Sequence, residues 1–389
     1  MSHFFSYNFT LNFWWICMYD VAVIGAGING CSVAYEFIQE GKRVILFDKE
    51  GIASGGSGAA GAFISPKFSK AGELKELLHE AFVYSYDFYD KNFPLCFTKA
   101  PLVHIGKDEA DDEALHVYKQ KTALKLKKVP TNLEKQLSQE AKKRENICLE
   151  AGVVDAQRVC NDMSCGAKFV KEKVDTLVYN DDYWVINETY SAKNIVLATG
   201  AYDMLIKEPY IQLRGVWGHR IDITTATQNP CSVHQYVSIS PSNDGKLAIG
   251  ATHNVHYHPE KNKEPYDIEQ GRAELLEKAA KTMQLENVEV LKDYTGLRSG
   301  SFDYLPMIGS LVLSNETLLT CKGSLHVKKP DFSKYVYYPN LTMINGSGGY
   351  GFVLAPYLAK ILTEHILHGE KISERIIPAR FFARWAKKL

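Results

Sequence analysis

The chain has 389 residues, of which 46% are hydrophobic, so it is long enough to bury a large core in one unit or in two interleaved domains. Lysine plus arginine and aspartate plus glutamate number 45 each, and this balance argues against bulk electrostatic capture of nucleic acid while leaving room for a local basic patch. Eight cysteines without a C-x-x-C pair predict reduced thiols in a cytoplasmic protein and argue against a disulfide frame or a cysteine zinc site.

The first 17 residues are aromatic and uncharged apart from His3. They lack the early basic residue and the small-residue cleavage site of a signal peptide, and they are too short and too polar to span a bilayer. Met18 directly precedes the first convincing strand. We therefore interpret Met18 as the natural start and the first 17 residues as an upstream extension, so that residues 1–18 lie before the first domain, and we expect no membrane attachment.

A strand, a glycine turn, a helix and a second strand follow in close succession. Val21–Ile24 is a short apolar run typical of a buried parallel strand, and Gly25–Gly30 reads G-x-G-x-x-G. Helical spacing then continues to Gly41, and the second strand, Arg43–Phe47, is closed by Asp48. This order predicts a dinucleotide-binding cradle, whereas an isolated G-x-G-x-x-G would be weak evidence.

Each position of the cradle has a physical task. Gly25 permits the tight turn, Gly27 lets the backbone approach a pyrophosphate, and Gly30 lets helix and strand pack closely. The helix N-terminus offers free N–H groups to the phosphates, and Asp48 can accept hydrogen bonds from both ribose hydroxyls. Close packing alone would also explain Gly30, and that structural role is compatible with the functional one.

The segment after the acidic residue favours FAD over NAD. Gly51–Ala62 reads GIASGGSGAAGA, a long run of small residues for which a nicotinamide enzyme has no need. In flavin enzymes a loop of this kind passes close to the isoalloxazine ring, where large side chains would clash. A flexible linker is the alternative, and it is disfavoured because ordered-looking sequence resumes at Phe63–Pro66.

Two later segments agree with a flavin. Asn194–Gly200 is an apolar strand that ends in Ala-Thr-Gly, where the backbone could meet the cofactor closely. Leu341–Asn345 leads into the glycine-rich turn Gly346–Gly351, and a helix is expected from about Phe352 to His368. The N-terminus of that helix could stabilise negative charge on the N1–C2=O edge of the flavin.

The three glycine segments, in this order from Tyr19 to about Gly369, resemble the D-amino-acid-oxidase-like family of FAD enzymes. Gly51–Phe63 is similar to the family's flavin loop, and Gly296–Gly309 is similar to its G-[LVI]-R-x-x-[ST]-x-D-x-x-P-x-[IV]-G signature. The resemblance implies an α/β (α+β) fold in which a Rossmann-like FAD-binding domain is interleaved with a smaller β-sheet substrate domain. FAD is expected to bind non-covalently, because no cysteine is clearly placed for a covalent bond.

Arg298 and Tyr350 are the candidate catalytic residues. A guanidinium grips a carboxylate with two hydrogen bonds, and the family's arginine at this motif position binds the substrate carboxylate, which implies the same role for Arg298. The alternatives are an ion pair with Asp303 for Arg298 and simple packing for Tyr350. The residues expected to contact FAD are Gly25, Gly27, Gly30, Asp48, Lys49, Ala53, Ser54, Gly58, Ala59, Gly200, Arg298, Gly346, Gly348, Gly349, Tyr350 and Gly351.

Four segments are similar to the oxidoreductase half of the family members that modify the wobble uridine of tRNA: Leu213–Ile223, Ile249–His253, Leu305–Gly309 and Asn345–Leu362. The resemblance implies oxidation of the C–N bond of 5-carboxymethylaminomethyluridine to the 5-aminomethyl form with release of glyoxylate. Without the methyltransferase half of those enzymes, the chain could equally be an oxidase or dehydrogenase of glycine, sarcosine or a D-amino acid. A flavoprotein that is mainly a binding subunit is disfavoured by Arg298 and the intact loop.

Histidines do not predict a metal site. His253, His256 and His258 have the spacing of a metal cluster, but on a strand only the last two would share a face. Flavin chemistry needs no metal, and for His219 a structural role is the expectation.

The cofactor segments are far apart in the sequence, which predicts interleaved domains. The FAD-binding domain is expected to comprise residues 19–90, 150–205, 290–310 and 335–370, the substrate domain residues 91–149 and 206–289, and a basic tail residues 371–389. Residues 115–145 hold nine basic and three acidic side chains, a balance of 9 − 3 = +6. This patch and the tail would suit tRNA phosphates, and a solvated helix face is the alternative. The oligomeric state stays open.

Overall fold

The computed structural model describes residues 18–68, 72–202, 205–321 and 329–389. The hypothesis that residues 1–17 precede the natural start concerns residues outside this description. Within the described part, no helix is both long and apolar enough to cross a membrane. Six cysteines of the described part are free thiols: Cys31, Cys96, Cys148, Cys160, Cys165 and Cys231.

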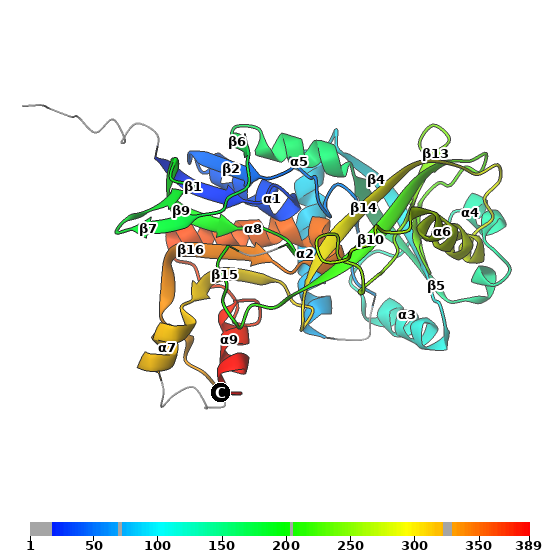
Figure 1. Cartoon of the computed structure of the whole chain (residues 1–389). Helices are drawn as coiled ribbons and strands as arrows, with labels where there is room; N and C mark the ends of the chain where they lie inside the picture. The colour runs from blue at the N-terminus through cyan, green and yellow to red at the C-terminus, as the bar shows by residue number, and fades with distance from the viewer. Residues whose placement is uncertain (1–17, 69–71, 203–204, 322–328) are drawn as a thin grey trace, which may run out of the picture.

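The predicted α/β fold is confirmed, with two eight-stranded sheets (Figure 1). The first sheet has the order β15-β16-β9-β1-β2-β6, and the β7–β8 hairpin pairs with β9. β2 and β9 run parallel to β1, and β16 runs parallel to β9, so their carboxyl ends meet at one edge. Its strands are β1 (Tyr19–Ile24), β2 (Val44–Asp48), β6 (Lys168–Lys171), β7 (Leu177–Asn180), β8 (Tyr183–Ile186), β9 (Tyr190–Leu197), β15 (Met307–Val312) and β16 (Tyr337–Asn345).

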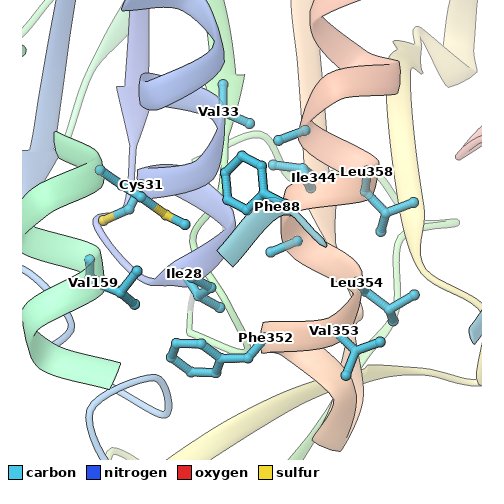
Figure 2. Close-up of a cluster of buried hydrophobic side chains, with 14 of the residues drawn as sticks. Ile28, Cys31, Val33, Phe88, Val159, Ile344, Phe352, Val353, Leu354 and Leu358 are labelled. Atoms are coloured by element: carbon cyan, nitrogen blue, oxygen red, sulfur yellow. The ribbon is translucent and has the colours of Figure 1, made fainter. Parts of the chain in front are cut away.

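Helices bury the apolar face of this sheet. Figure 2 shows Ile28 and Cys31 of α1 facing Val159 of α5 and Phe352 of α8, with all four side chains buried. On the other face, Phe382 of α9 belongs to the core beneath β1 and β2. The helices of this half are α1 (Ile28–Gln39), α2 (Glu73–Asn92), α5 (Ala156–Ser164), α7 (Ser314–Thr320), α8 (Gly351–His368) and α9 (Ala379–Ala386), with short 3₁₀ turns η3 (Phe332–Lys334) and η4 (Gly348–Tyr350).

The second sheet has the order β14-β10-β13-β12-β11-β4-β5-β3 and its own buried core. Its strands are β3 (Phe63–Ile64), β4 (Phe97–Ile105), β5 (Asn146–Val154), β10 (Leu213–Thr224), β11 (Ser232–His234), β12 (Ser238–Ile239), β13 (Lys246–Gly250) and β14 (Glu289–Ser301). The helices α3 (Glu109–Lys121), α4 (Thr131–Gln136) and α6 (Ile268–Thr282) and the turn η2 (Ala141–Lys143) lie around this sheet (Figure 1).

Residues 235–240 have the composition of a strand, but only Ser238–Ile239 form one. The backbone turns back before it, with Gln235 N–H donating to the carbonyl of Val237 at 3.1 Å. The result is the two short antiparallel strands β11 and β12. Apolar alternation cannot distinguish a continuous strand from two short ones, because both bury every second residue.

The long antiparallel pair β10–β14 links the sheets. β14 pairs with β10 from Ser301 to Glu289, and its carboxyl end bridges to the glycine-rich turn at Ser347 through Gly300. Residues 290–301, which the sequence analysis grouped with the cofactor segments, therefore run in the second sheet and end at the first. The division into two interleaved domains stays a prediction.

Candidate active site

The glycine cradle lies where the parallel strands end. A Cβ on Gly30 would overlap the carbonyl oxygen of Gly25, and Gly25 itself has φ +106°, a backbone conformation that favours glycine. The Asp48 carboxylate fixes the turn, since Oδ2 accepts from Ala26 N–H at 2.9 Å and Oδ1 accepts from Glu50 N–H at 2.9 Å. Asp48 is half-buried and is the last residue of β2, and its role as a ribose-binding acid stays a prediction.

Ser57 is a polar residue of the site that the sequence analysis missed. Its Oγ accepts a hydrogen bond from Ile28 N–H, in the first turn of α1, at 2.9 Å. A Cβ on Gly27 would lie 3.0 Å from the same oxygen. Its hydroxyl is one of two in the loop of residues 51–62, with that of Ser54, and this is the signal that could have found it.

The loop of residues 51–62 is packed, so the alternative of a flexible linker is wrong. Ala53 N–H donates to the carbonyl of Ala26 at 2.8 Å, which ties the loop to the cradle. On its other side, a Cβ on Gly56 would come within 2.6 Å of the Leu297 carbonyl, and a Cβ on Gly296 would come within 2.7 Å of the Gly56 backbone. Glycines on both partners thus let the loop lie directly on β14, next to Arg298.

Asn345 joins the remaining segments and was also missed as an individual residue. Its Oδ1 accepts from Ser299 Oγ at 2.7 Å and from Gly346 N–H at 2.8 Å, and its Nδ2 donates to the carbonyl of Gly200 at 2.9 Å. Ser347 in the following turn hydrogen-bonds Asn29 of α1 at 3.2 Å. The three glycine segments and β14 therefore converge at one place.

The N-termini of the two helices α1 and α8 face the place where the glycine segments and β14 converge. α1 has Gly27 as its N-cap and α8 has Tyr350, neither makes a side-chain capping bond, and neither helix has an acidic residue in its first turn. A Cβ on Gly348 or Gly349 would meet nothing within 4 Å. Uncapped positive helix ends beside open, side-chain-free backbone fit a large anionic cofactor.

Arg298 lies half-buried without a carboxylate partner among the described residues. Its Nη1 donates to the Thr252 carbonyl at 3.1 Å, and its guanidinium covers Gly218, where any Cβ would collide with it. Burial lowers the pKa of Arg298. A cation held in place with unused donors is suited to a ligand carboxylate.

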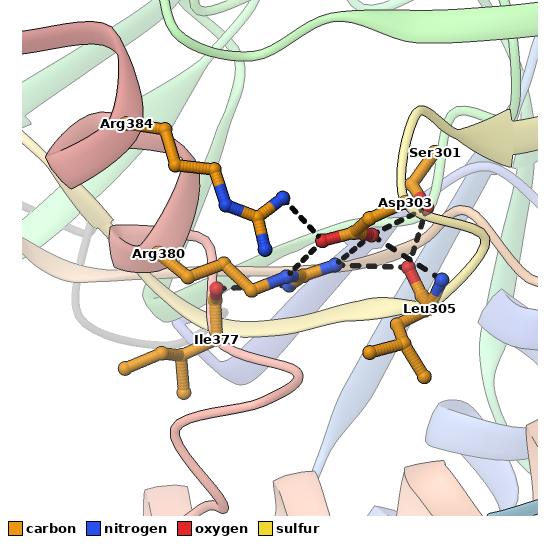
Figure 3. Close-up of polar contacts among 6 residues, drawn as sticks. All are labelled: Ser301, Asp303, Leu305, Ile377, Arg380 and Arg384. Atoms are coloured by element: carbon orange, nitrogen blue, oxygen red, sulfur yellow. Dashed lines mark hydrogen bonds and ion pairs between the residues drawn. The ribbon is translucent and has the colours of Figure 1, made fainter. Parts of the chain in front are cut away.

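Asp303, the alternative partner of Arg298, is bound elsewhere. Figure 3 shows its carboxylate between two arginines of α9: Arg380 donates from Nε and Nη2, each at 3.0 Å, and Arg384 donates from Nη1 at 2.8 Å. Arg380 is only 6% exposed. The alternative of an ion pair between Asp303 and Arg298 is therefore wrong. Part of the basic tail is the folded helix α9, in which Arg380 is buried.

Other predicted site residues differ in their contacts. The Tyr350 hydroxyl accepts from Lys67 Nζ at 3.3 Å, so Tyr350 has a polar partner as well as packing. Lys49 forms an ion pair with Glu260 at 2.7 Å and lies over the Tyr202 ring. The remaining predicted residues, Ser54, Gly58, Ala59 and Gly351, lie in the packed loop or at the start of α8.

The histidines belong to no metal site in the described part of the chain, where no group of three potential ligands is close enough to hold an ion. His219 is fully buried and hydrogen-bonds Asp293 at 2.9 Å, in line with a structural role. Residues 255–258 form no strand.

The fold and the converging glycine segments define a flavoprotein. The chain belongs to the family described as FAD dependent oxidoreductase (DAO), whose model matches residues 20–365. It is therefore an FAD-dependent oxidoreductase, and the residues of the site fit the cofactor.

Relatives and solved structures agree with this family. The chain is 24% identical to the tRNA 5-methylaminomethyl-2-thiouridine biosynthesis bifunctional protein MnmC of Legionella pneumophila, over 93% of this chain and 57% of that protein. It is 24% identical to the Dichelobacter nodosus protein of the same name, over 94% and 58%. The chain thus spans less than two thirds of these relatives.

The fold is shared with small-molecule enzymes. Glycine oxidase from Bacillus cereus superposes with a TM-score of 0.69 at 20% identity, covering 91% of this chain and 96% of that one. L-proline dehydrogenase from P. horikoshii gives 0.72 at 17% identity, covering 94% and 98%.

Substitutions at two glycines distinguish an effect on the stability of the fold from an effect on FAD binding. Gly30→Ala forces a methyl group into the Gly25 carbonyl and is expected to cost about 1–3 kcal/mol of stability and to release FAD. The methyl group of Gly349→Ala would meet no protein atom within 4 Å. This variant should therefore keep the wild-type Tm of the FAD-free protein while binding FAD more weakly. Thermal unfolding and the FAD content per chain measure both effects. Equal Tm losses in the two FAD-free variants would contradict this assignment.

Proposed function

We propose that this enzyme oxidises the C–N bond of an amine that carries a glycine-like N–CH₂–COO⁻ group. Arg298 carries the proposal: a half-buried guanidinium, unpaired by any described carboxylate, lies beside the loop that packs on β14. A charged group in this setting is costly unless a partner of opposite charge completes it. A substrate carboxylate supplies that partner.

Arg298 would bind the carboxylate with two parallel hydrogen bonds and so fix which C–H faces the cofactor. FAD, which accepts the hydride when bound, would be held by residues 25–30, Asp48, the loop of residues 51–62 with Ser57, and residues 346–351. The N-terminus of α8 would stabilise negative charge at the edge of the ring system. The amine must be neutral to give up hydride, and water then hydrolyses the substrate imine to an amine and glyoxylate.

The proposed substrate is 5-carboxymethylaminomethyluridine in tRNA, converted to the 5-aminomethyl base. The similarity to two MnmC proteins over 93% and 94% of this chain supports it. Nucleoside analysis of tRNA from a strain that lacks this gene tests it. The carboxymethylaminomethyl nucleoside should accumulate there, and an unchanged wobble-uridine profile would refute the tRNA reaction.

A free amino acid such as glycine, sarcosine or a D-amino acid is the second candidate. The same Arg298 would bind its carboxylate, and the fold is shared with glycine oxidase along nearly the whole of that chain. Anaerobic mixing with each amino acid, followed by the flavin absorbance, distinguishes the candidates. Rapid bleaching by a free amino acid, without bleaching by tRNA, would favour this second function.

The surface around α3 and α4 allows a test of RNA binding. Lys125 and Lys128 are exposed and make no ion pair with another described residue, whereas Lys127 pairs with Glu150. K125E/K128E should weaken tRNA binding. It should also reduce the steepness of the plot of log binding constant against log salt concentration by about two, which is about one for each lost phosphate contact. K168E/K171E, an equal charge change on exposed residues of β6, is the matched control. Equal effects of the two double variants would exclude a specific patch.

A further inference from the structure

An exposed aromatic turn lies directly after the strand that carries Arg298. β14 ends at Ser301, and the turn that follows exposes Phe302 to 57% and Tyr304 to 62% while Asp303 between them points inward to α9. Tyr304 has φ +65°, an unfavourable conformation for an aromatic residue. The chain thus holds two large rings in solvent on a turn that is fixed from below.

Arginine side chains lie at this turn, and one of them lies over the Tyr304 ring. The Arg214 guanidinium lies 4.9 Å from the centre of the Tyr304 ring, and the described residues offer Arg214 no carboxylate. Arg384, with a side chain that is 58% exposed, reaches the same turn through Asp303. Exposed aromatic rings next to guanidinium groups are the combination on which unpaired RNA bases stack.

The aromatic turn lies close to Arg298 along the paired strands β10 and β14. Arg214 pairs with Gly300 and Val216 pairs with Arg298, so Arg214 and Arg298 lie two residues apart along the β10–β14 ladder. Gly300 also bridges to Ser347 in the glycine-rich turn. A nucleotide adjacent to the reacting one in an RNA loop could therefore reach the turn while the carboxylate is held at Arg298.

We propose that Phe302, Tyr304 and Arg214 form a stacking platform for an unpaired RNA base that neighbours the uridine being oxidised. This inference rests on the proposed tRNA substrate and adds the surface that selects an RNA loop over a free amino acid. A small-molecule enzyme gains nothing from two solvent-exposed rings at this place. Two aromatic residues of the basic tail, Phe381 and Phe382, are buried and offer an RNA base no surface.

The test uses the FAD-loaded protein and an anticodon stem-loop with 2-aminopurine next to the wobble uridine. Wild-type protein should bind it and quench its fluorescence by stacking. F302S/Y304N should bind about tenfold or more weakly and lose the quenching, because each stacked base contributes about 1–3 kcal/mol. Asparagine tolerates the positive φ at position 304. L95S, at a side chain that is 78% exposed, is the control and should bind as wild type.

Flavin reduction by the free modified nucleoside separates a platform from a structural role. F302S/Y304N should keep the wild-type rate with the free nucleoside and lose activity only with RNA. Unchanged RNA binding and quenching in this variant would overturn the platform and leave the proposed function standing. Loss of the reaction with the free nucleoside would also overturn the platform, since the turn would then act by positioning Arg298. Failure of wild-type protein to bind the RNA would overturn both proposals.

Discussion

Replacing Arg298 with alanine is expected to leave a folded, yellow protein whose kcat/KM for flavin reduction by substrate is about 10²- to 10⁴-fold lower. The variant loses two charge-assisted hydrogen bonds to the substrate, which contribute about 1.5–3 kcal/mol each. Arg298 donates to one backbone carbonyl and to no described carboxylate, so its loss leaves no buried charge behind. Stopped-flow mixing under anaerobic conditions measures the rate, and the flavin spectrum reports cofactor retention.

Two further variants sharpen this experiment. Arg298→Lys keeps the charge but loses the planar fork, so its rate should lie between those of wild type and Arg298→Ala. Arg375→Ala removes an exposed arginine whose ion-pair partner is Glu76, and it should behave as wild type. A wild-type rate in Arg298→Ala would show that another group binds the carboxylate.

Replacing Asp303 with asparagine is expected to destabilise the protein by about 3–5 kcal/mol, because Arg380 would remain buried without its carboxylate. The loss should appear as a lower denaturant midpoint with α9 detached. Asp331→Asn removes an exposed carboxylate that pairs with Lys334, and its midpoint should stay close to that of wild type. Similar midpoints for the two variants would mean that α9 is held by its apolar face alone.

The same carboxylate predicts an acid dependence of stability. Burial by itself would raise the pKa of Asp303, but hydrogen bonding and charge from Arg380, with smaller contributions from Ser301 and Arg384, hold it below its ordinary value. A carboxylate whose pKa is depressed in the folded state stabilises the protein at pH values above its unfolded-state pKa of about 4. This stabilisation is lost as the pH falls through the folded-state pKa. Wild-type protein should therefore lose stability below about pH 4 more steeply than Asp303→Asn, as unfolding at a series of pH values can measure.

Local patterns in the sequence predicted the cradle, the loop and the final glycine turn correctly as structure. Each consists of consecutive residues whose spacing or size has a direct geometric meaning, such as the run from Val21 to Asp48.

Contacts between distant residues could not be predicted in this way. Asn345 meets Ser299 across 46 positions, and Arg380 meets Asp303 across 77. Nothing in the local pattern of the tail distinguishes an arginine that binds RNA from one that locks a helix onto a turn, because both are flanked by aromatic residues. Only the fold decides which of them is buried.

The central claim is that the enzyme oxidises a glycine-like amine whose carboxylate is held by Arg298, with the wobble uridine of tRNA as substrate. The most direct measurement is anaerobic mixing of the FAD-loaded protein with tRNA that carries 5-carboxymethylaminomethyluridine, followed by flavin absorbance and a glyoxylate assay. We predict bleaching of the flavin with one glyoxylate released per flavin reduced. Full retention of the oxidised spectrum and no glyoxylate would contradict the claim.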